Sequence, residues 1–226
     1  DAITHMIELG YNEINANCVY EEGWKPVHAT VFYDQLKKLA DYILEHNLDM
    51  EKDYYISLFE EKYFRPKQED DLENWCGGNG VMLAVDPDGI IYPCLRYMES
   101  SLAGQQEPYS IGDVDTGICQ CECHKCRVEC LKKIDRRTQS TDECFNCPVA
   151  EGCSWCTAYN YQVFGTPDAR ATYICNMHKA RALGNIYFWN NYYKKHGIDK
   201  HMENYVPEKW ALDIITQAEW NMLNSL

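Results

Sequence analysis

The sequence has no apolar run near the length of about 20 residues that a membrane-spanning helix needs. Its first residues, Asp1–Met6, carry neither the basic nor the apolar region of a secretion signal. Positive charge is scarce: 21 Lys and Arg stand against 35 Asp and Glu, a formal net charge of -14. So acidic a chain repels nucleic-acid phosphates, and no local stripe of basic and aromatic residues compensates. We therefore expect a cytoplasmic protein that has neither a membrane nor a nucleic acid as partner.

Glycine and proline are also few, at 13 and 8 of 226 residues, which excludes collagen-like and strongly low-complexity chains. Apolar residues make up 46% of the sequence, enough to bury a sizeable core. The chain begins at Asp1 rather than at a methionine, and we expect further sequence upstream.

Cysteine, by contrast, is abundant, with 13 in 226 residues. Without a secretion signal the expected compartment is reducing, where thiols persist as metal ligands or reactive groups. An odd count also leaves one thiol over in any scheme made only of disulfides. Metal binding is therefore the leading interpretation, with disulfides as the alternative.

Residues 1–70 predict an α/β segment. Alternating residues predict a strand over 14–20, and apolar spacing predicts a helix from an N-cap at Thr30 to the region of Asn47. A second short strand is expected over 54–59. A strand, helix, strand order of this length predicts parallel pairing. One such unit leaves edges and a face uncovered, so we expect it to belong to a larger sheet or barrel.

A composition change after Arg65-Pro66 predicts a second domain over residues 71–180. Two apolar runs, 81–84 and 90–92, flank the turn sequence Asp-Pro-Asp-Gly and predict a hairpin with Cys94 just past its second strand. Between 109 and 175 we expect only short segments between cysteines, because ligands replace packing there.

Residues 181–226 are expected to form a helical tail. A helix is predicted from 175 to about 195, ended by Gly197, and another from Pro207. The aromatic residues of 187–193 could line a peptide groove, but their helical spacing favours core packing against the cysteine-rich domain.

Seven cysteines form a pattern: Cys76, Cys94, the run Cys144-x2-Cys147-x5-Cys153-x2-Cys156, and Cys175. Zinc ribbons separate their two Cys-x2-Cys pairs by about 15 to 20 residues, far more than here. Crowded cysteines suit iron-sulfur clusters, where neighbouring thiolates can serve two different clusters. A structural zinc domain remains the alternative.

The run Asp88-Gly-Ile-Ile-Tyr-Pro-Cys94 with Cys76, the segment Gly112-Asp-Val114, the cysteines 144–156 and the trailing Cys175 resemble the SPASM domain. This domain is the C-terminal extension of radical S-adenosylmethionine enzymes that modify peptides. Residues 1–70 are similar to the last strands and helix of the partial (β/α) barrel that precedes it. Residues 131–161 resemble maturases of cysteine-repeat precursor peptides.

The resemblance implies two auxiliary 4Fe-4S clusters. It assigns Cys76, Cys94 and Cys156 to the first, and Cys144, Cys147, Cys153 and Cys175 to the second. Some family members carry a further cysteine just after the position of Cys76, where this chain reads Gly77-Gly-Asn-Gly80. One iron of the first cluster would then be open to a soft ligand such as a substrate thiolate. Two residues, rather than the three usual in the family, separate Cys153 from Cys156.

The family's Cys-x3-Cys-x2-Cys loop, which holds a third cluster and S-adenosylmethionine, does not precede the α/β segment. The spacing recurs at Cys119, Cys123 and Cys126, in a run that also holds Cys121 and Cys130. Lys125 stands where the family usually has an aromatic residue. We interpret the run as a surface loop with surplus thiols; a metal site using His124 and a genuine cluster loop are the alternatives.

These observations lead to one functional expectation. The chain is the auxiliary-cluster portion of a radical S-adenosylmethionine enzyme, whose partners are a cysteine-containing precursor peptide and an electron donor. On its own it is expected to be inactive, and no catalytic residue is assigned. The alternatives are a stand-alone iron-sulfur electron-transfer or peptide-docking module, and a zinc-stabilised scaffold.

Overall fold

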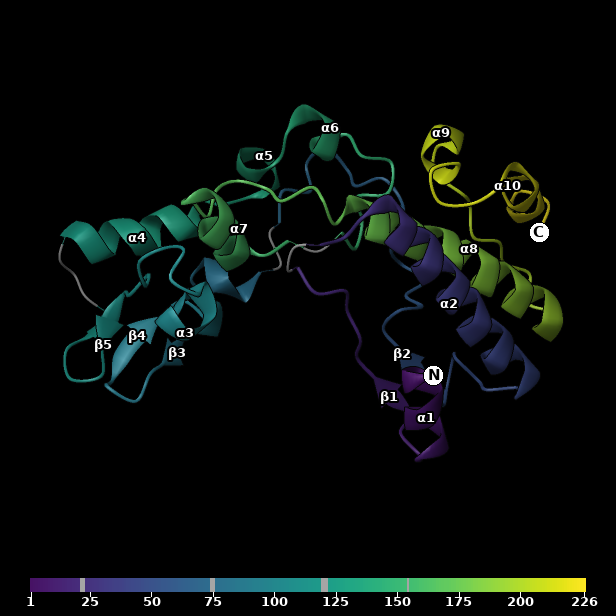
Figure 1. The fold of residues 1–226 in the computed structure, drawn as a ribbon, viewed down its shortest axis with the longest axis horizontal. Coiled ribbons are helices and arrows are strands. Elements are labelled where there is room, and N and C mark those ends of the chain that lie inside the picture. The colour runs from purple at the N-terminus through teal and green to yellow at the C-terminus, as the bar shows by residue number, and fades with distance from the viewer. Residues whose placement is uncertain (21–22, 74–75, 119–121, 154) are drawn as a thin grey trace. The chain divides into compact units, whose positions relative to one another are not determined.

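The computed structural model describes residues 1–20, 23–73, 76–118, 122–153 and 155–226, and for 122–126 it describes the backbone only. It is a mixed helix and strand protein with two small sheets (Figure 1). Two compact units make up the chain. Unit 1 comprises 1–67, 148–153 and 173–226, and unit 2 comprises 68–147 and 154–172. No described helix is both long and apolar enough to cross a membrane.

The units interleave along the chain, whereas the segments 1–70, 71–180 and 181–226 expected from sequence are contiguous. The C-terminal helices belong to the same compact unit as residues 1–67, together with the short stretch 148–153 from the cysteine-rich region. Composition could indicate the change near residue 70. It could not indicate this return of the chain, because the return depends on packing between distant residues.

Unit 1 begins with a parallel strand pair joined by a long helix. Its first half holds α1 (Ala2–Glu8), β1 (Glu13–Ile14), α2 (Pro26–Glu45) and β2 (Tyr55–Ile56). Glu13 pairs with Tyr55 and Ile14 with Ile56, in parallel, as expected from the connection length.

The strands are much shorter than the expected 14–20 and 54–59, and those longer ranges were wrong. Just past β1 the Ser57 side chain replaces the ladder: its Oγ accepts from the Ala16 N–H at 2.8 Å and donates to the Ala16 carbonyl at 3.0 Å. Side-chain alternation therefore continues beyond the point where backbone pairing between the strands stops.

Helix α2 begins four residues before the expected N-cap at Thr30, and that expectation was wrong. Pro26 stands at the first helical position, where its missing N–H has no partner to lose, after Lys25 as N-cap. The His28 ring nitrogen accepts from the Lys25 N–H at 3.0 Å. The C-terminal end near Asn47 is as expected, with Asn47 at φ +53°.

The second half of unit 1 is helical, with α8 (Cys175–His196), α9 (Glu208–Ala211) and α10 (Gln217–Leu223). Gly197 ends α8 in the left-handed conformation, as expected. Where one helix was expected after Pro207, the structure has two short ones, because Thr216 begins a new helix by accepting from the Glu219 N–H.

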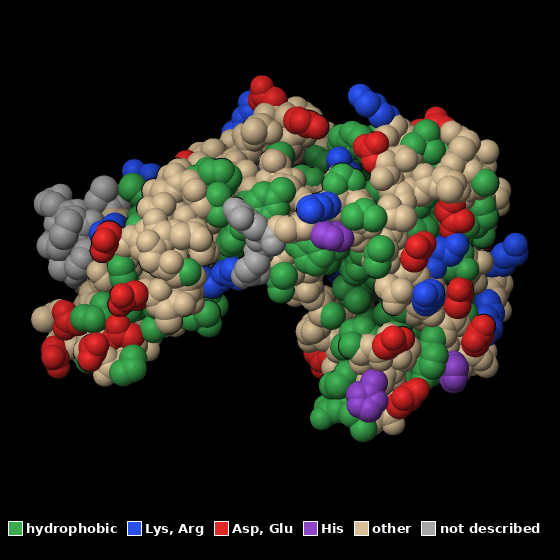
Figure 2. All heavy atoms as spheres, in the orientation of Figure 1, with side chains coloured by type: hydrophobic (Ala, Val, Ile, Leu, Met, Phe, Trp, Pro, Cys, Tyr) green, Lys and Arg blue, Asp and Glu red, His purple; other side chains and the backbone are tan. Residues whose placement is uncertain are grey.

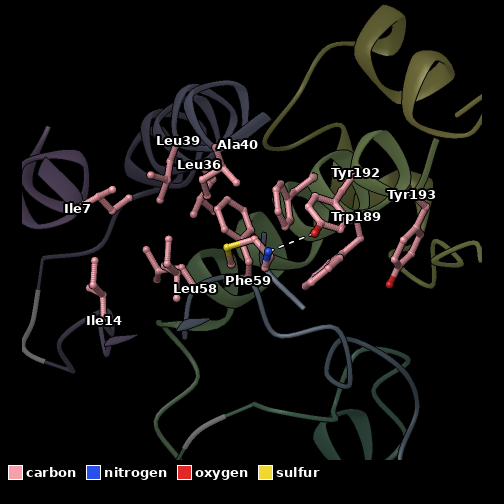
Figure 3. Close-up of a cluster of buried hydrophobic side chains, with 14 residues drawn as sticks. Ile7, Ile14, Leu36, Leu39, Ala40, Leu58, Phe59, Trp189, Tyr192 and Tyr193 are labelled. Carbon is pink, nitrogen blue, oxygen red and sulfur yellow. Dashed lines mark hydrogen bonds between the residues drawn. The ribbon is translucent and has the colours of Figure 1, made fainter. Parts of the chain in front are cut away.

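The core of unit 1 lies between α2 and α8 (Figure 3). The apolar stripe of α2, with Leu36, Leu39 and Ala40, faces the aromatic residues of α8, and Figure 3 shows Trp189 and Tyr192 directed into the same cluster. The Tyr192 hydroxyl accepts from the Met50 N–H at 3.1 Å. The aromatic residues are core, as expected, but they pack on residues of unit 1, and the expected partner, the cysteine-rich domain, was wrong.

Unit 2 carries an antiparallel sheet in the order β3-β4-β5-β6. Its strands are β3 (Ala84–Val85), β4 (Ile90–Tyr92), β5 (Gly112–Asp113) and β6 (Gly117–Ile118), so the expected hairpin is confirmed with its first strand shifted. The turn is held by Asp86, whose carboxylate accepts from the N–H groups of Asp88 and Ile90.

Short helices complete unit 2: η1 (Gly77–Asn79), η2 (Leu95–Tyr97), α3 (Glu99–Leu102), α4 (Glu122–Lys132), α5 (Arg136–Gln139), α6 (Asp142–Phe145) and α7 (Thr157–Phe164). The 11-residue α4 contradicts the expected loop over 122–130. Cys119 and Cys121 lie outside the described residues. The stretch is largely polar and so shows no apolar helical periodicity, but it contains no glycine or proline that would break a helix.

Candidate metal centre

Three of the predicted ligands, Cys76, Cys94 and Cys156, belong to unit 2 and come from three separate connections. Cys76 immediately precedes η1, Cys94 immediately precedes η2, and Cys156 immediately precedes α7. Helix α7 packs on both η1 and η2. The three residues therefore stand at the N-terminal ends of three helical segments, and that of α7 contacts the other two.

Gly78 lies at the centre of this arrangement. A Cβ placed on Gly78 would be 3.4 Å from the Cys94 Sγ and 3.5 Å from the Cys76 Sγ. Both sulfurs thus lie beside Gly78, where the absence of a side chain leaves their common surface open. We call the group of Cys76, Cys94 and Cys156 around Gly78 the three-thiol site.

Cys156 is linked to the site by the contacts of the next residue, Thr157, and by the charges that act on its thiol. The Thr157 hydroxyl lies 3.5 Å from the Cys76 Sγ, and the Tyr159 N–H donates to the Cys156 Sγ at 3.4 Å. Burial raises the pKa of Cys156, and the charges of Cys76 and Cys94 raise it further. Because Thr157 directly follows Cys156 and contacts the Cys76 sulfur, Cys156 lies in the neighbourhood of the other thiols.

Burial likewise raises the pKa of Cys94, with Cys76 adding to the effect, while nearby Arg96 and hydrogen bonds from the backbone oppose it. A buried thiol becomes a thiolate ligand where positive charge offsets the cost of its burial. Arg96 supplies positive charge, and its guanidinium lies over the Tyr159 ring at 5.6 Å. A bound metal would supply more.

The site sits on an aromatic support. Tyr97, fully buried, contacts the rings of Tyr109 and Tyr161 at 5.1 Å and 5.8 Å between ring centroids. Cys94 and Cys156 pack against the same cluster of buried side chains. Rigid packing behind the thiols favours a fixed ligand geometry over a collapsed one.

The other four predicted ligands are divided between the two units. Cys144 and Cys147 belong to unit 2, where the Cys144 N–H donates to Thr141 at the start of α6. Cys153 and Cys175 belong to unit 1. That these four share one cluster stays a prediction.

Within unit 1, Gly152 next to Cys153 is held closely: a Cβ there would be 2.2 Å from the Tyr63 ring, and its φ is +71°. Cys175 is the first residue of α8. His178, one turn later, bonds the Val149 carbonyl at 2.7 Å and contacts the Phe64 ring, which gives it a packing role.

No described group of three or more His, Cys, Asp or Glu side chains is arranged to hold a single metal ion. A tetrahedral zinc with bonds of 2.3 Å would need its sulfurs about 3.8 Å apart. A cube of four irons is larger and would hold its thiolates farther apart than a single zinc ion does.

Several residues of the site were missed by sequence reasoning. The resemblance marks Gly78 only as a position without a cysteine, and it gives no role to Thr157 or Arg96. Paired glycines directly after a ligand cysteine were an available signal, because glycine often marks the close approach of a backbone to a bound group.

Asn15 and Asn17 are exposed beyond β1. Cys18 is only partly buried, and burial raises its pKa although Arg181 acts against this. Neither observation adds a ligand to the three-thiol site, which lies in the other unit.

No protein-family model matches the chain, and no curated protein or solved structure matches it either.

Proposed function

We propose that the protein binds iron-sulfur clusters, and that it is the auxiliary-cluster portion of a radical S-adenosylmethionine enzyme that modifies a cysteine-containing peptide. The observation that supports this most is the convergence of Cys76, Cys94 and Cys156 around Gly78. The three residues are far apart in sequence, and the packing of α7 on η1 and η2 supports placing them in one site.

The chemistry of the donors favours iron over a hard cation. Thiolates are soft ligands that select iron-sulfur clusters, zinc or copper(I), whereas magnesium and calcium take oxygen ligands. The site residues would hold the cluster as follows: three sulfurs ligate, while the Thr157 hydroxyl and the Tyr159 N–H donate to sulfur. Hydrogen bonds to sulfur and a nearby positive charge such as Arg96 tune a cluster's reduction potential.

With three protein thiolates, a cube has one iron left for another ligand. In the proposed enzyme that ligand is a cysteine thiolate of the peptide, which would anchor the substrate during modification. The first segment of unit 1, with its parallel β1 and β2, would be the end of the partial barrel. The compartment would be the cytoplasm, where the thiols stay reduced.

The test is metal and sulfide analysis of the purified protein after anaerobic reconstitution with iron and sulfide. Two 4Fe-4S clusters predict about eight irons per chain with a matching amount of sulfide. One or two tightly bound zinc ions without sulfide would establish the alternative, a zinc-stabilised scaffold. Cys18→Ser is the matched control, since it removes a thiol outside both ligand sets.

A further inference from the structure

The outer edge of β3 in unit 2 is exposed and apolar. Leading into and through this strand, Val81, Met82, Leu83 and Val85 have exposed fractions of 84%, 50%, 54% and 52%. Proteins usually protect a sheet edge with charged residues, proline or a covering segment. Residues 81–85 contain neither a charge nor a proline, and no described strand pairs with β3 on the side away from β4.

The backbone of Val85 points its hydrogen-bonding groups away from β4. Val85 stands opposite Ile91, and the Ile91 carbonyl accepts from the Ile111 N–H, on the other side of β4. The next pair along the hairpin is bonded, with the Asp86 N–H donating to the Ile90 carbonyl. Because bonded and non-bonded pairs alternate in an antiparallel ladder, the N–H and C=O of Val85 are directed to the open edge.

The surroundings of this edge are acidic. Residues 81–118, which carry the sheet and its turns, contain six Asp and Glu and a single basic residue, Arg96. Two basic residues of α4 lie nearby, Lys132 beside Gly80 and Arg127 bonded to the Ser110 carbonyl, so acidic residues remain in excess. Figure 2 shows red acidic side chains gathered at the end of this sheet, at the lower left. A basic partner is attracted to such a surface and an acidic one is repelled.

The edge also begins next to the three-thiol site. The N–H groups of Val81 and Met82 both donate to the Gly77 carbonyl, and a Cβ on Gly77 would lie 3.4 Å from the Met82 sulfur. Gly78, which the thiols surround, is the next residue. A chain paired with β3 would therefore run toward the metal centre.

We propose that β3 docks an extended peptide segment that alternates apolar and basic residues, adding it as a further strand to the sheet. Main-chain hydrogen bonds at Val85 supply affinity, and the exposed apolar side chains with the acidic surroundings supply selectivity. The inference deepens the proposed function: it specifies how the peptide is held so that its cysteine reaches the open iron.

The experiment uses the full chain and a short fluorescein-labelled peptide of alternating valine and lysine, with binding followed by fluorescence anisotropy. Val85→Pro removes the outward N–H without touching a bond inside the sheet, as proline is tolerated at an edge. We expect it to weaken binding about tenfold. Val85→Thr keeps the N–H and the β-branched shape, and we expect it to bind as the unmodified protein does.

Two further arms keep the test decisive. Leu83→Lys places a positive charge beside the edge and should weaken binding of the lysine peptide even if the proline variant does not fold. A peptide with glutamate in place of lysine, and one with methylated backbone amides, should bind at least about tenfold more weakly.

Equal binding of all these peptides, or of the Val85→Pro and unmodified proteins, overturns the proposal. So does self-association of the protein that Val85→Pro abolishes, since a second copy would then be the occupant. Iron content measured on the same samples separates the docking proposal from the proposed function. If the peptide does not bind but the protein holds its full iron content, only the docking proposal fails. If the peptide binds but the protein holds no iron, only the proposed cluster binding fails.

Discussion

Gly184 of α8 and Leu36 of α2 approach so closely that no side chain fits between them. A Cβ on Gly184 would lie 2.9 Å from Leu36 Cδ1 and 3.0 Å from Leu36 Cβ. Both residues are fully buried in the core of unit 1. This contact sets the distance at which the two longest helices pack, and with it the frame that carries Cys175 at the start of α8.

Gly184→Ala is expected to destabilise the protein by about 1–2 kcal/mol. Alanine in a helix interior normally stabilises by about 1 kcal/mol relative to glycine, but forcing a methyl group into a packed core costs about 1–3 kcal/mol. Urea unfolding followed by circular dichroism measures the change. In a Leu36→Ala background the same substitution should become neutral or stabilising; a stabilising effect in the unmodified protein would show that the helices are not packed this closely.

Glu219 of α10 ties the C-terminal helix to α2. Its carboxylate accepts from the Lys37 ammonium at 2.5 Å and from the Tyr33 hydroxyl at 2.7 Å. Burial pushes the pKa of Glu219 upward, but the hydrogen bonds and charge of Lys37 and Tyr33 prevail and hold the pKa below its ordinary value. A carboxylate with a depressed pKa in the folded state stabilises that state above its unfolded pKa, about 4.3 for glutamate.

That contribution is lost as the pH falls below about 4.3 toward the lower pKa of the folded protein. Glu219→Gln should cost about 1–2 kcal/mol at neutral pH and flatten the decline of stability at acid pH. Thermal unfolding from pH 7 to pH 3 tests this. Glu45→Gln, at an exposed position of α2, is the control. If stability falls with pH in the same way in both variants, the ionisation of Glu219 does not contribute to acid unfolding.

Gly78→Ala is expected to reduce iron binding although it removes no ligand. Its Cβ would contact both the Cys76 and the Cys94 sulfur and lie 3.3 Å from the Thr157 hydroxyl. Gly77→Ala is the matched control in the same helical turn, because its Cβ would meet only the flexible Met82 side chain. Iron analysis after reconstitution should show a loss of iron of the order of half in Gly78→Ala and little loss in Gly77→Ala. Equal losses would mean that the backbone of the helical turn, rather than the space beside the sulfurs, determines iron binding.

Arg96→Gln should make the reduction potential of the first cluster more negative, by on the order of 50 mV, because a nearby positive charge favours the reduced cluster. Arg96→Lys should restore most of the difference. Redox titration monitored by electron paramagnetic resonance gives the potential. A potential that is unchanged in the glutamine variant would indicate that the guanidinium does not act on the cluster.

Local patterns predicted some of these elements and missed others. Gly197 after α8 and the Asp86 turn of the hairpin are chemical signals that act within a few residues, and both appear where expected. The length of β1 depends on Ser57, 41 residues away from Ala16, and the site depends on Gly78 meeting two distant connections. Such long-range contacts leave no periodic trace in one sequence.

For the predicted metal ligands, too, the sequence indicated some residues of the site and missed others. Cysteine spacing could group Cys76, Cys94 and Cys156 by resemblance. The structure places the Cys76 and Cys94 sulfurs beside Gly78, and that all three cysteines share one cluster stays a prediction. Spacing could not indicate that Thr157 and Arg96 stand beside them, because a threonine or an arginine has no characteristic position in such a motif.

The most direct test of the three-thiol site is the iron and sulfide content of a variant in which Cys76, Cys94 and Cys156 are all replaced by serine. After anaerobic reconstitution, iron should fall from about eight to about four per chain, with sulfide falling in parallel. A variant that keeps the full iron and sulfide content of the unmodified protein would contradict the assignment of a cluster to these three thiols.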